Sequence, residues 1–111
     1  MKAYLISILH VDNDEYVSRY VTNVPLIIRD YGGEYVAVSK RIVRMQGDGE
    51  NPDVIAITVW PSLEAIKQFF SDSRYQPYKR LRIEQSYGDI FAMETVANPV
   101  DPDSIEWKSN A

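Results

Sequence analysis

Apolar residues recur at two different spacings along this chain, and the order of these spacings limits the folds that it can adopt. Four stretches rich in β-branched and aromatic side chains predict strands: residues 3–11, 34–39, 53–60 and 87–96. Residues 41–45 are expected to extend or resume the second strand. Apolar side chains at three- and four-residue steps predict helices over 13–31 and 63–70, and a short further helix is predicted over 73–83. The order is therefore strand, helix, strand, strand, helix, strand.

Turn residues mark where the first helix begins and ends. Asp12 is the predicted N-cap. Pro25 removes an amide donor inside the helix, so a kink or a restart near Asn23 is expected. Gly32 and Gly33 are expected to end the helix, because glycine adopts the left-handed conformation without steric cost. Phosphate-binding loops place their glycines before a helix, so this pair after a helix indicates a turn and not an anion site.

The second helical region contains two predicted caps. Ser62 follows Pro61, which stops the third strand, and can cap the helix after it. Ser73 is the predicted cap of the short helix, which would place Pro77 in its first turn, where a missing amide costs little.

This order predicts an α+β fold of the ferredoxin-like βαββαβ type, with a four-stranded antiparallel sheet and the helices on one face. The first and third strands are apolar on both sides, so the other sheet face would expose an apolar patch. A homodimer through that exposed sheet face would cover it. Residues 1–96 form the predicted domain, and residues 97–111 form an acidic C-terminal tail that could pack on a partner through Ile105 and Trp107.

Composition excludes several classes of function. The chain has 111 residues, a net charge of −4 and no cysteine, so thiolate metal sites, thiol nucleophiles and disulfides are excluded. The acidic balance argues against a nucleic-acid partner, because phosphates need a basic face. No window approaches the roughly 18 apolar residues that a membrane span requires, so a soluble cytoplasmic protein without a membrane partner is expected.

Two segments resemble a known bacterial family. The stretch "VPLIIRDYGGEYV" together with "VWPSLEAIKQFFSDSRYQPYKRLR" is similar to the domain-of-unknown-function family 1330, a branch of the dimeric α+β barrel superfamily. The resemblance covers roughly Ala3 to Val96 and implies that two sheets form a barrel in a dimer. Relatives across that superfamily include cofactor-free monooxygenases, lactone isomerases, haem enzymes and ligand-sensing regulatory domains, so the resemblance implies a fold and leaves the function open.

His10 is the only histidine and the candidate catalytic acid or base. The alternative is a strand-end histidine that is bonded to its neighbours. A triad with Ser7 and Asp12 is excluded, because side chains alternate between the two faces of a strand and these three cannot converge. The acidic clusters near residues 12–15 and 48–53 lack the spacing of calcium ligands, so no metal site is predicted.

Candidate ligand-binding residues are tyrosines and arginines: Tyr16, Tyr20, Arg41, Tyr75 and Arg82. Tyrosines at helical spacing are usually core residues, but convergent hydroxyls could also line a pocket for a polar organic ligand. Arg41 could hold a carboxylate or phenolate bidentately or lie on a solvated strand rim, and Arg82 is the second candidate for such a contact. Three hypotheses follow: a small-molecule-binding protein with a cofactor-independent enzymatic activity as an option, a non-catalytic ligand-binding or regulatory module, and a structural interaction protein.

Overall fold

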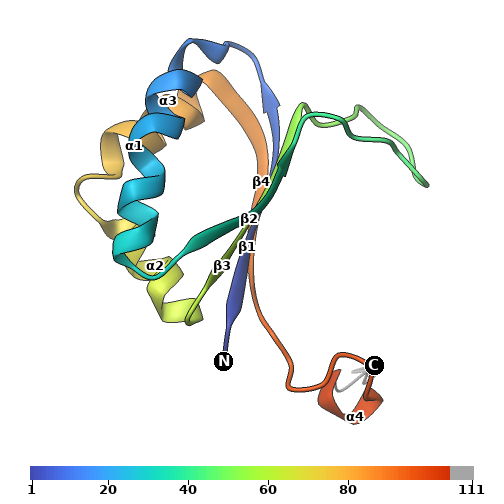
Figure 1. Ribbon diagram of the computed structural model, residues 1–111. Helices are drawn as coiled ribbons and strands as arrows, with labels where there is room; N and C mark the ends of the chain where they lie inside the picture. The colour runs from blue at the N-terminus through green and yellow to red at the C-terminus, as the bar shows by residue number, and fades with distance from the viewer. Residues whose placement is uncertain (106–111) are drawn as a thin grey trace.

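Four antiparallel strands form one sheet in the computed structural model, which describes residues 1–105 (Figure 1). The strands are β1 (Ala3–Val11), β2 (Glu34–Ser39), β3 (Val54–Trp60) and β4 (Ser86–Glu94), in the spatial order β2-β3-β1-β4. The central strands β1 and β3 are the two whose apolar residues occupy both faces. This arrangement confirms the predicted ferredoxin-like α+β fold.

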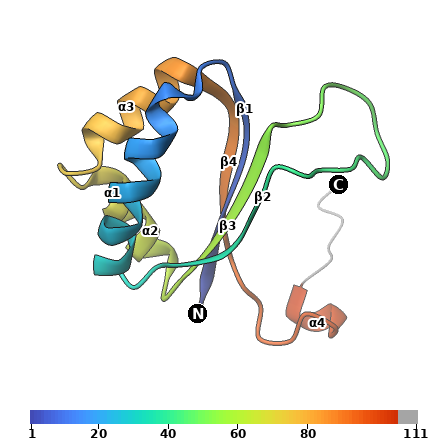
Figure 2. The ribbon, with the colours of Figure 1, turned by 45° about the horizontal axis from the view of Figure 1, so that its top comes forward.

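A helical layer covers one face of the sheet, as the views in Figures 1 and 2 agree. It consists of the short 3-10 helix η1 (Asp14–Tyr16), α1 (Val17–Asp30), α2 (Leu63–Ser71) and α3 (Gln76–Gln85). The core lies between the two layers, where α1 contributes Val24, Ile27 and Ile28, and these pack with Trp60 and Phe69. A four-residue helix, α4 (Pro102–Ile105), follows the last strand.

The helix boundaries differ from the sequence predictions in three places. Asn13, and not Asp12, caps the first turn, because its side-chain oxygen accepts a hydrogen bond from the Glu15 amide at 3.0 Å. No restart occurs near Asn23, since α1 runs unbroken through Pro25. Ser73 does not cap α3, which begins at Gln76 after Tyr75 without a side-chain cap.

Other predicted boundaries hold. Ser62 caps α2, and its hydroxyl oxygen accepts from the Ala65 amide at 3.1 Å. Pro77 lies in the first turn of α3.

The predicted extension of the second strand over residues 41–45 is wrong, because β2 ends at Ser39 and residues 40–53 form an irregular connection to β3. Because Arg41 lies outside β2, the alternation of side chains along a strand does not assign it to either face of the sheet.

The glycine pair turns the chain from α1 into β2, as predicted. Gly32 has φ of 82°, and the Gly33 amide donates to the Ile28 carbonyl at 3.0 Å, which closes the helix end. Gly33 also allows close packing, because a Cβ there would lie 2.5 Å from Ile28 Cγ2 and 3.0 Å from the Trp60 ring. The two glycines have a conformational and a packing role.

A polar cluster ties the end of α1 to the connection between α2 and α3. The Tyr31 hydroxyl donates to Asp72 Oδ2 at 2.6 Å. Arg74 donates to the same carboxylate at 2.9 Å and to Asp30 at 2.7 Å. The segments "YGG" and "SDSRYQ", which are 41 residues apart at Tyr31 and Asp72, therefore meet in space and hold the helical layer together.

Asp72→Asn is expected to make the protein less sensitive to acid. Hydrogen bonds from Arg74 and Tyr31 hold the pKa of Asp72 well below its usual range. A lowered folded-state pKa stabilises the protein above the unfolded pKa of about 3.9, and this contribution is lost as the pH falls through the folded-state pKa. Thermal melts from about pH 5 to about pH 2 should show a smaller drop in Tm for Asp72→Asn than for the wild type. Asp48→Asn, in the exposed β2–β3 connection, is the control; identical pH profiles for the two variants would contradict the assignment.

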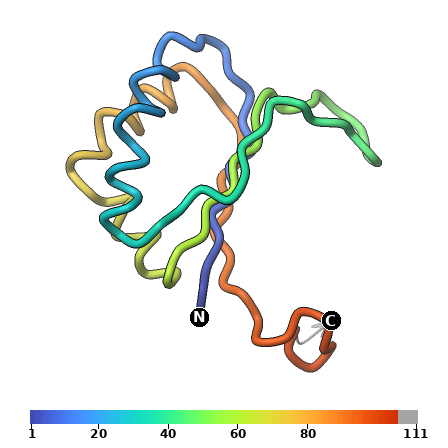
Figure 3. Tube along the Cα trace, viewed as in Figure 1, coloured from blue at the N-terminus to red at the C-terminus, as the bar shows by residue number. Residues whose placement is uncertain are grey.

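The opposite face of the sheet, which we call the outer face, is not covered by α1, α2 or α3 (Figure 3). Its exposed apolar side chains include Val36, Tyr87, Phe91 and Met93. Figures 1 and 2 show that the 40–53 connection, which we call the arm, projects to this side, and that α4 lies on it near the other end of the sheet. Val43 and Met45 on the arm are exposed. Ile105 is half-buried, and Trp107 lies outside the described residues.

Within residues 1–105, no helix has the length and apolar character needed to cross a bilayer.

Candidate functional site

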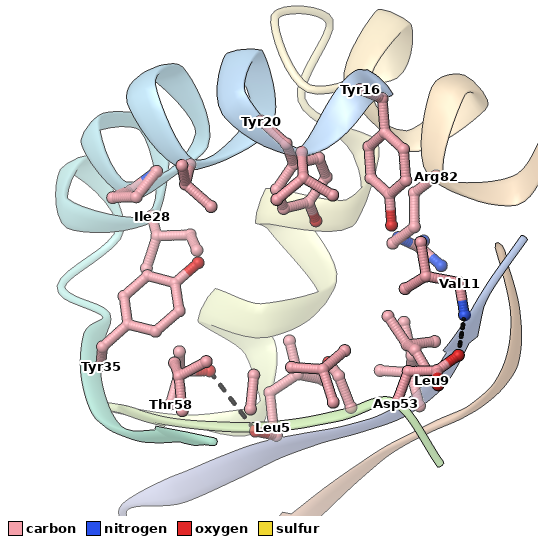
Figure 4. Close-up of a pocket in the computed structure, with 18 of the residues that line it drawn as sticks. Leu5, Leu9, Val11, Tyr16, Tyr20, Ile28, Tyr35, Asp53, Thr58 and Arg82 are labelled. Atoms are coloured by element: carbon pink, nitrogen blue, oxygen red, sulfur yellow. Dashed lines mark hydrogen bonds between the residues drawn. The ribbon is translucent and has the colours of Figure 1, made fainter. Parts of the chain in front are cut away.

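A cavity of about 960 Å³ lies between the sheet and the helical layer (Figure 4). Alternate residues of the two central strands form its floor: Leu5, Ser7, Leu9 and Val11 of β1, and Val54, Ala56 and Thr58 of β3. Helix α1 and Arg82 of α3 close it from above, and Tyr35 of β2 stands at one side. The volume is in the range of small-molecule sites.

The cavity exists because the core fills only one end of the space between the layers. At the end of the sheet where β1 begins and β3 ends, three residues are almost fully buried: Ala3, Trp60 and Phe69. Toward the other end, where β1 runs into η1, the lining becomes polar and contains Asp12, Asn13, Asp14, Lys40 and Asp53. Exposed Asp12, Asn13 and Asp14 mark this end as the mouth.

Two tyrosines from different helices meet at the cavity wall. The hydroxyl oxygens of Tyr20 on α1 and Tyr75, which directly precedes α3, are 2.8 Å apart. Tyr16 packs edge-on against Tyr20, with ring centroids 5.9 Å apart. Burial, followed by the neighbouring Tyr75, raises the pKa of Tyr20 well above its ordinary value. Tyr20 is therefore a neutral phenol at physiological pH and can donate a hydrogen bond.

Arg82 is a buried cation in the same cavity. Its residue surface is 9% exposed, and its Nε has no hydrogen-bond partner among residues 1–105. No described carboxylate forms an ion pair with it within 4.0 Å. Burial disfavours the charged form, but the oxygens of Tyr75 and Tyr20 outweigh it and raise the pKa of Arg82. The guanidinium remains charged and only partly satisfied.

Four of the six candidate site residues from the sequence thus line one cavity: Tyr16, Tyr20, Tyr75 and Arg82. Four further residues that line the cavity were not predicted from the sequence: Ser7, Tyr35, Lys40 and Thr58. Strand alternation could have grouped Ser7 with Leu5 and Leu9 on one face of β1. The position of Lys40 beyond the end of β2 carried no such signal.

His10 lies on the outer face, away from the cavity. Residues 5, 7, 9 and 11 of β1 face the cavity, so alternation turns His10 to the other side. Its ring stacks on Tyr87 with centroids 4.7 Å apart, and its Nδ1 is 2.9 Å from Glu50 Oε1. The Tyr87 hydroxyl donates to the same Glu50 oxygen at 3.1 Å. The histidine therefore helps to fix the arm to the sheet and does not reach a ligand in the cavity.

Arg41 also lies outside the cavity. It is exposed on the arm, where its amide donates to Ser39 Oγ at 3.0 Å. The strand ends before it, and the preceding residue, Lys40, lines the cavity instead.

No group of three or more metal-ligating side chains is present within the described part of the chain. Inside the cavity the polar groups include tyrosine hydroxyls and the Arg82 guanidinium, and at its mouth they include Lys40 and three aspartates.

Comparisons with known proteins agree with the fold. The sequence model of the protein family described as "Domain of unknown function (DUF1330)" matches residues 2–96 of this chain. No curated protein matches the chain in sequence.

Three solved structures illustrate the structural similarity. A protein of unknown function from Rhodopseudomonas palustris has 15% identity and a TM-score of 0.72, over 87% of this chain and 84% of that one. SnoaB from Streptomyces nogalater, described as a cofactor-independent oxygenase, has 14% identity and a TM-score of 0.62, over 90% and 98%. A dimeric protein of unknown function with a ferredoxin-like fold from Bacteroides fragilis has 10% identity and a TM-score of 0.55, over 85% and 96%. At these identities the similarity shows the fold alone.

Proposed function

Because this chain belongs to the family described as a domain of unknown function (DUF1330), whose description names no activity, we propose a function from the geometry: the protein binds a small, largely apolar organic molecule in the cavity between sheet and helices. The observation that carries this proposal is the cavity of about 960 Å³ itself, which has apolar walls and a buried cluster of Tyr20, Tyr75 and Arg82. Natural cores are packed at high density and contain few voids larger than a water molecule, so a space of this size is a feature to be filled.

Ala56→Phe is expected to weaken ligand binding at least tenfold, because the new ring would occupy the floor of the cavity. The probe is N-phenyl-1-naphthylamine, a neutral dye that becomes fluorescent in apolar sites, titrated into the purified protein. Ala92→Phe is the matched control, since Ala92 pairs with Leu5 and shares its face of the sheet but is exposed and outside the cavity lining.

Circular dichroism establishes that each variant is folded, and Ser7→Phe on β1 is a second cavity-filling change for use if Ala56→Phe does not fold. Equal binding by wild type, Ala56→Phe and Ser7→Phe would overturn the proposal.

We propose that a second copy of the chain covers the outer face. The exposed apolar side chains of β4 support this, and so does the arm that projects on the same side. The description of the similar protein from Bacteroides fragilis as dimeric also supports it. Soluble monomers rarely expose contiguous apolar patches larger than a few hundred Å², and a two-fold symmetric contact buries such a patch on both copies at once.

Catalysis without a metal or organic cofactor is a second candidate, with a non-catalytic ligand-binding or regulatory module as its alternative. The cluster of Arg82 with Tyr20 and Tyr75 favours catalysis, because such donors can stabilise an oxyanion. The similarity in fold to SnoaB, described as a cofactor-independent oxygenase, is consistent with catalysis.

An assay of turnover on a panel of phenols and lactones, with dioxygen consumption followed, separates the enzyme from the non-catalytic module. Turnover that Arg82→Gln abolishes and that His10→Ala and Arg41→Ala leave unchanged supports an enzyme; binding without turnover supports the module.

A further inference from the structure

The cavity contains a positive charge that the described protein does not neutralise. Arg82 is 9% exposed, its Nε has no partner, and no carboxylate of residues 1–105 lies within 4.0 Å of its guanidinium. Buried charges in proteins are normally paired, because an unpaired one loses hydration without compensation. The two nearby tyrosine hydroxyls compensate only in part, because a phenol carries no charge at neutral pH. The cavity therefore lacks one negatively charged group beside Arg82.

The donor count at this point indicates what that group must offer. The Tyr20 and Tyr75 hydroxyls, 2.8 Å apart, carry two hydrogens, and the bond between them uses one. The remaining phenol hydrogen and the Arg82 N–H groups are donors, and arginine cannot accept. The site thus requires an oxygen that accepts several hydrogen bonds and carries charge, as a carboxylate or a phenolate does.

The remaining charges around the cavity limit the ligand to one negative charge. Asp12, Asp14 and Asp53 line the mouth together with a single lysine, Lys40. Asp53 Oδ2 already accepts from the Val11 amide at 2.7 Å. A second anionic group reaching the mouth would meet an excess of carboxylates, whereas one beside Arg82 would be neutralised.

The walls beside Arg82 fit a flat ring. Phe69, Phe70, Tyr16, Tyr20, Tyr35 and Tyr75 all line the cavity. The rings of Phe69 and Tyr75 are stacked with centroids 4.2 Å apart, which offers a layered aromatic surface. Aromatic rings add favourable offset or edge-on contacts to the burial of apolar area.

From these observations we infer that the ligand is an aromatic monoanion whose carboxylate or phenolate oxygen binds to Arg82 and the Tyr20–Tyr75 pair. This inference rests on the proposed function, because it specifies the ligand class of the same cavity. Arg82 favours a negatively charged ligand over a neutral one, and the aromatic side chains of the wall favour a flat ring over other shapes.

The test for a carboxylate compares two fluorescent probes of nearly equal shape, anthracene-2-carboxylate and its neutral analogue anthracene-2-carboxamide. The wild type should bind the carboxylate at least tenfold more tightly than the amide, as expected for a charge-assisted contact. Arg82→Gln should reduce this preference to within about twofold, because it weakens binding of the carboxylate far more than binding of the amide. Arg80→Gln, two residues away on α3 and exposed, is the matched control and should behave as the wild type.

The test for a phenolate uses 4-nitrophenol, whose ionised form is yellow. Binding beside Arg82 should lower the pKa of the bound phenol in the wild type and in Arg80→Gln but not in Arg82→Gln, a shift that a purely structural arginine would not produce. Arg82→Lys keeps the charge and should retain part of the preference for the anion if Arg82→Gln does not fold.

The possible results are distinguishable. Equal affinity of the wild type for the carboxylate and the amide, together with an unshifted 4-nitrophenol, would overturn the inference and leave the proposed function standing. Binding of N-phenyl-1-naphthylamine without binding of either anthracene or of nitrophenol would also overturn it. Failure of the neutral dye and of all three other probes would overturn the proposed function as well.

Discussion

Gly88→Ala is expected to destabilise the protein by at least about 3 kcal/mol, the sum of backbone strain and overpacking. Gly88 lies in β4 opposite Leu9 of β1 and has φ of 142°, a conformation that residues with a Cβ rarely adopt. A Cβ at this position would also overlap with the carbonyl oxygen of Ile8 and lie 3.1 Å from the Leu9 Cα. These are backbone atoms of the central strand, so they cannot move aside as a side chain could. Urea unfolding followed by tryptophan fluorescence measures the change in the free energy of unfolding.

Gly49→Ala is the matched control for this experiment. Gly49 also has a positive φ, 110°, but a Cβ there would meet only the far end of Arg44 at 3.9 Å. This variant should show the conformational cost alone, about 1 kcal/mol. A Gly88→Ala variant that is no less stable than Gly49→Ala would show that β1 and β4 do not approach each other as described.

Phe91→Asp is expected to convert a dimer into a monomer. Phe91 pairs with Ile6 of β1 and is 56% exposed on the outer face, at the middle of the proposed contact between two sheets. A carboxylate buried there in each subunit would be unpaired and would face its symmetry mate, which costs several kcal/mol for each copy. Light scattering coupled to size exclusion should give twice the chain mass of 12.8 kDa for the wild type and the chain mass for the variant.

Leu26→Asp is the matched control for the dimer. Leu26 lies on α1 and is 55% exposed, so it has the same apolar exposure on the helical side of the molecule. This variant should remain dimeric, and circular dichroism should show both variants folded. A wild type that runs as a monomer, or a dimer that Leu26→Asp dissociates while Phe91→Asp does not, would exclude the outer face as the contact.

The order of the elements was predictable from the sequence because hydrophobic periodicity is a local property. The nearly continuous apolar runs of β1 and β3 are typical of central strands, and the three- and four-residue steps of α1 reflect its buried face; a sheet with helices on one side accommodates both patterns. Boundaries were less predictable where several polar residues compete. Asn13 instead of Asp12 caps the first turn, and two residues lie between the expected cap Ser73 and the first residue of α3.

The candidate site was predictable only where it coincided with that periodicity. Tyr16, Tyr20 and Tyr75 were proposed because they share inward faces of helices, and those faces do turn to the cavity. His10 was proposed for its chemistry alone, and strand alternation turns it to the other side of the sheet. Arg41 failed as a cavity residue because β2 ends two residues before it.

The sequence by itself determined the family, the order of helices and strands and the position of the turn at Gly32 and Gly33, because these depend on residues that are near one another in the chain. Only the tertiary structure decided that Tyr31 meets Asp72, that Tyr20 meets Tyr75, and that Arg82 lies in a cavity without a counter-charge from residues 1–105. Such contacts join residues from separate elements, and their geometry depends on how the helical layer is placed over the sheet. The helices leave one end of the sheet uncovered by core side chains, and that placement, which no local pattern encodes, creates the site.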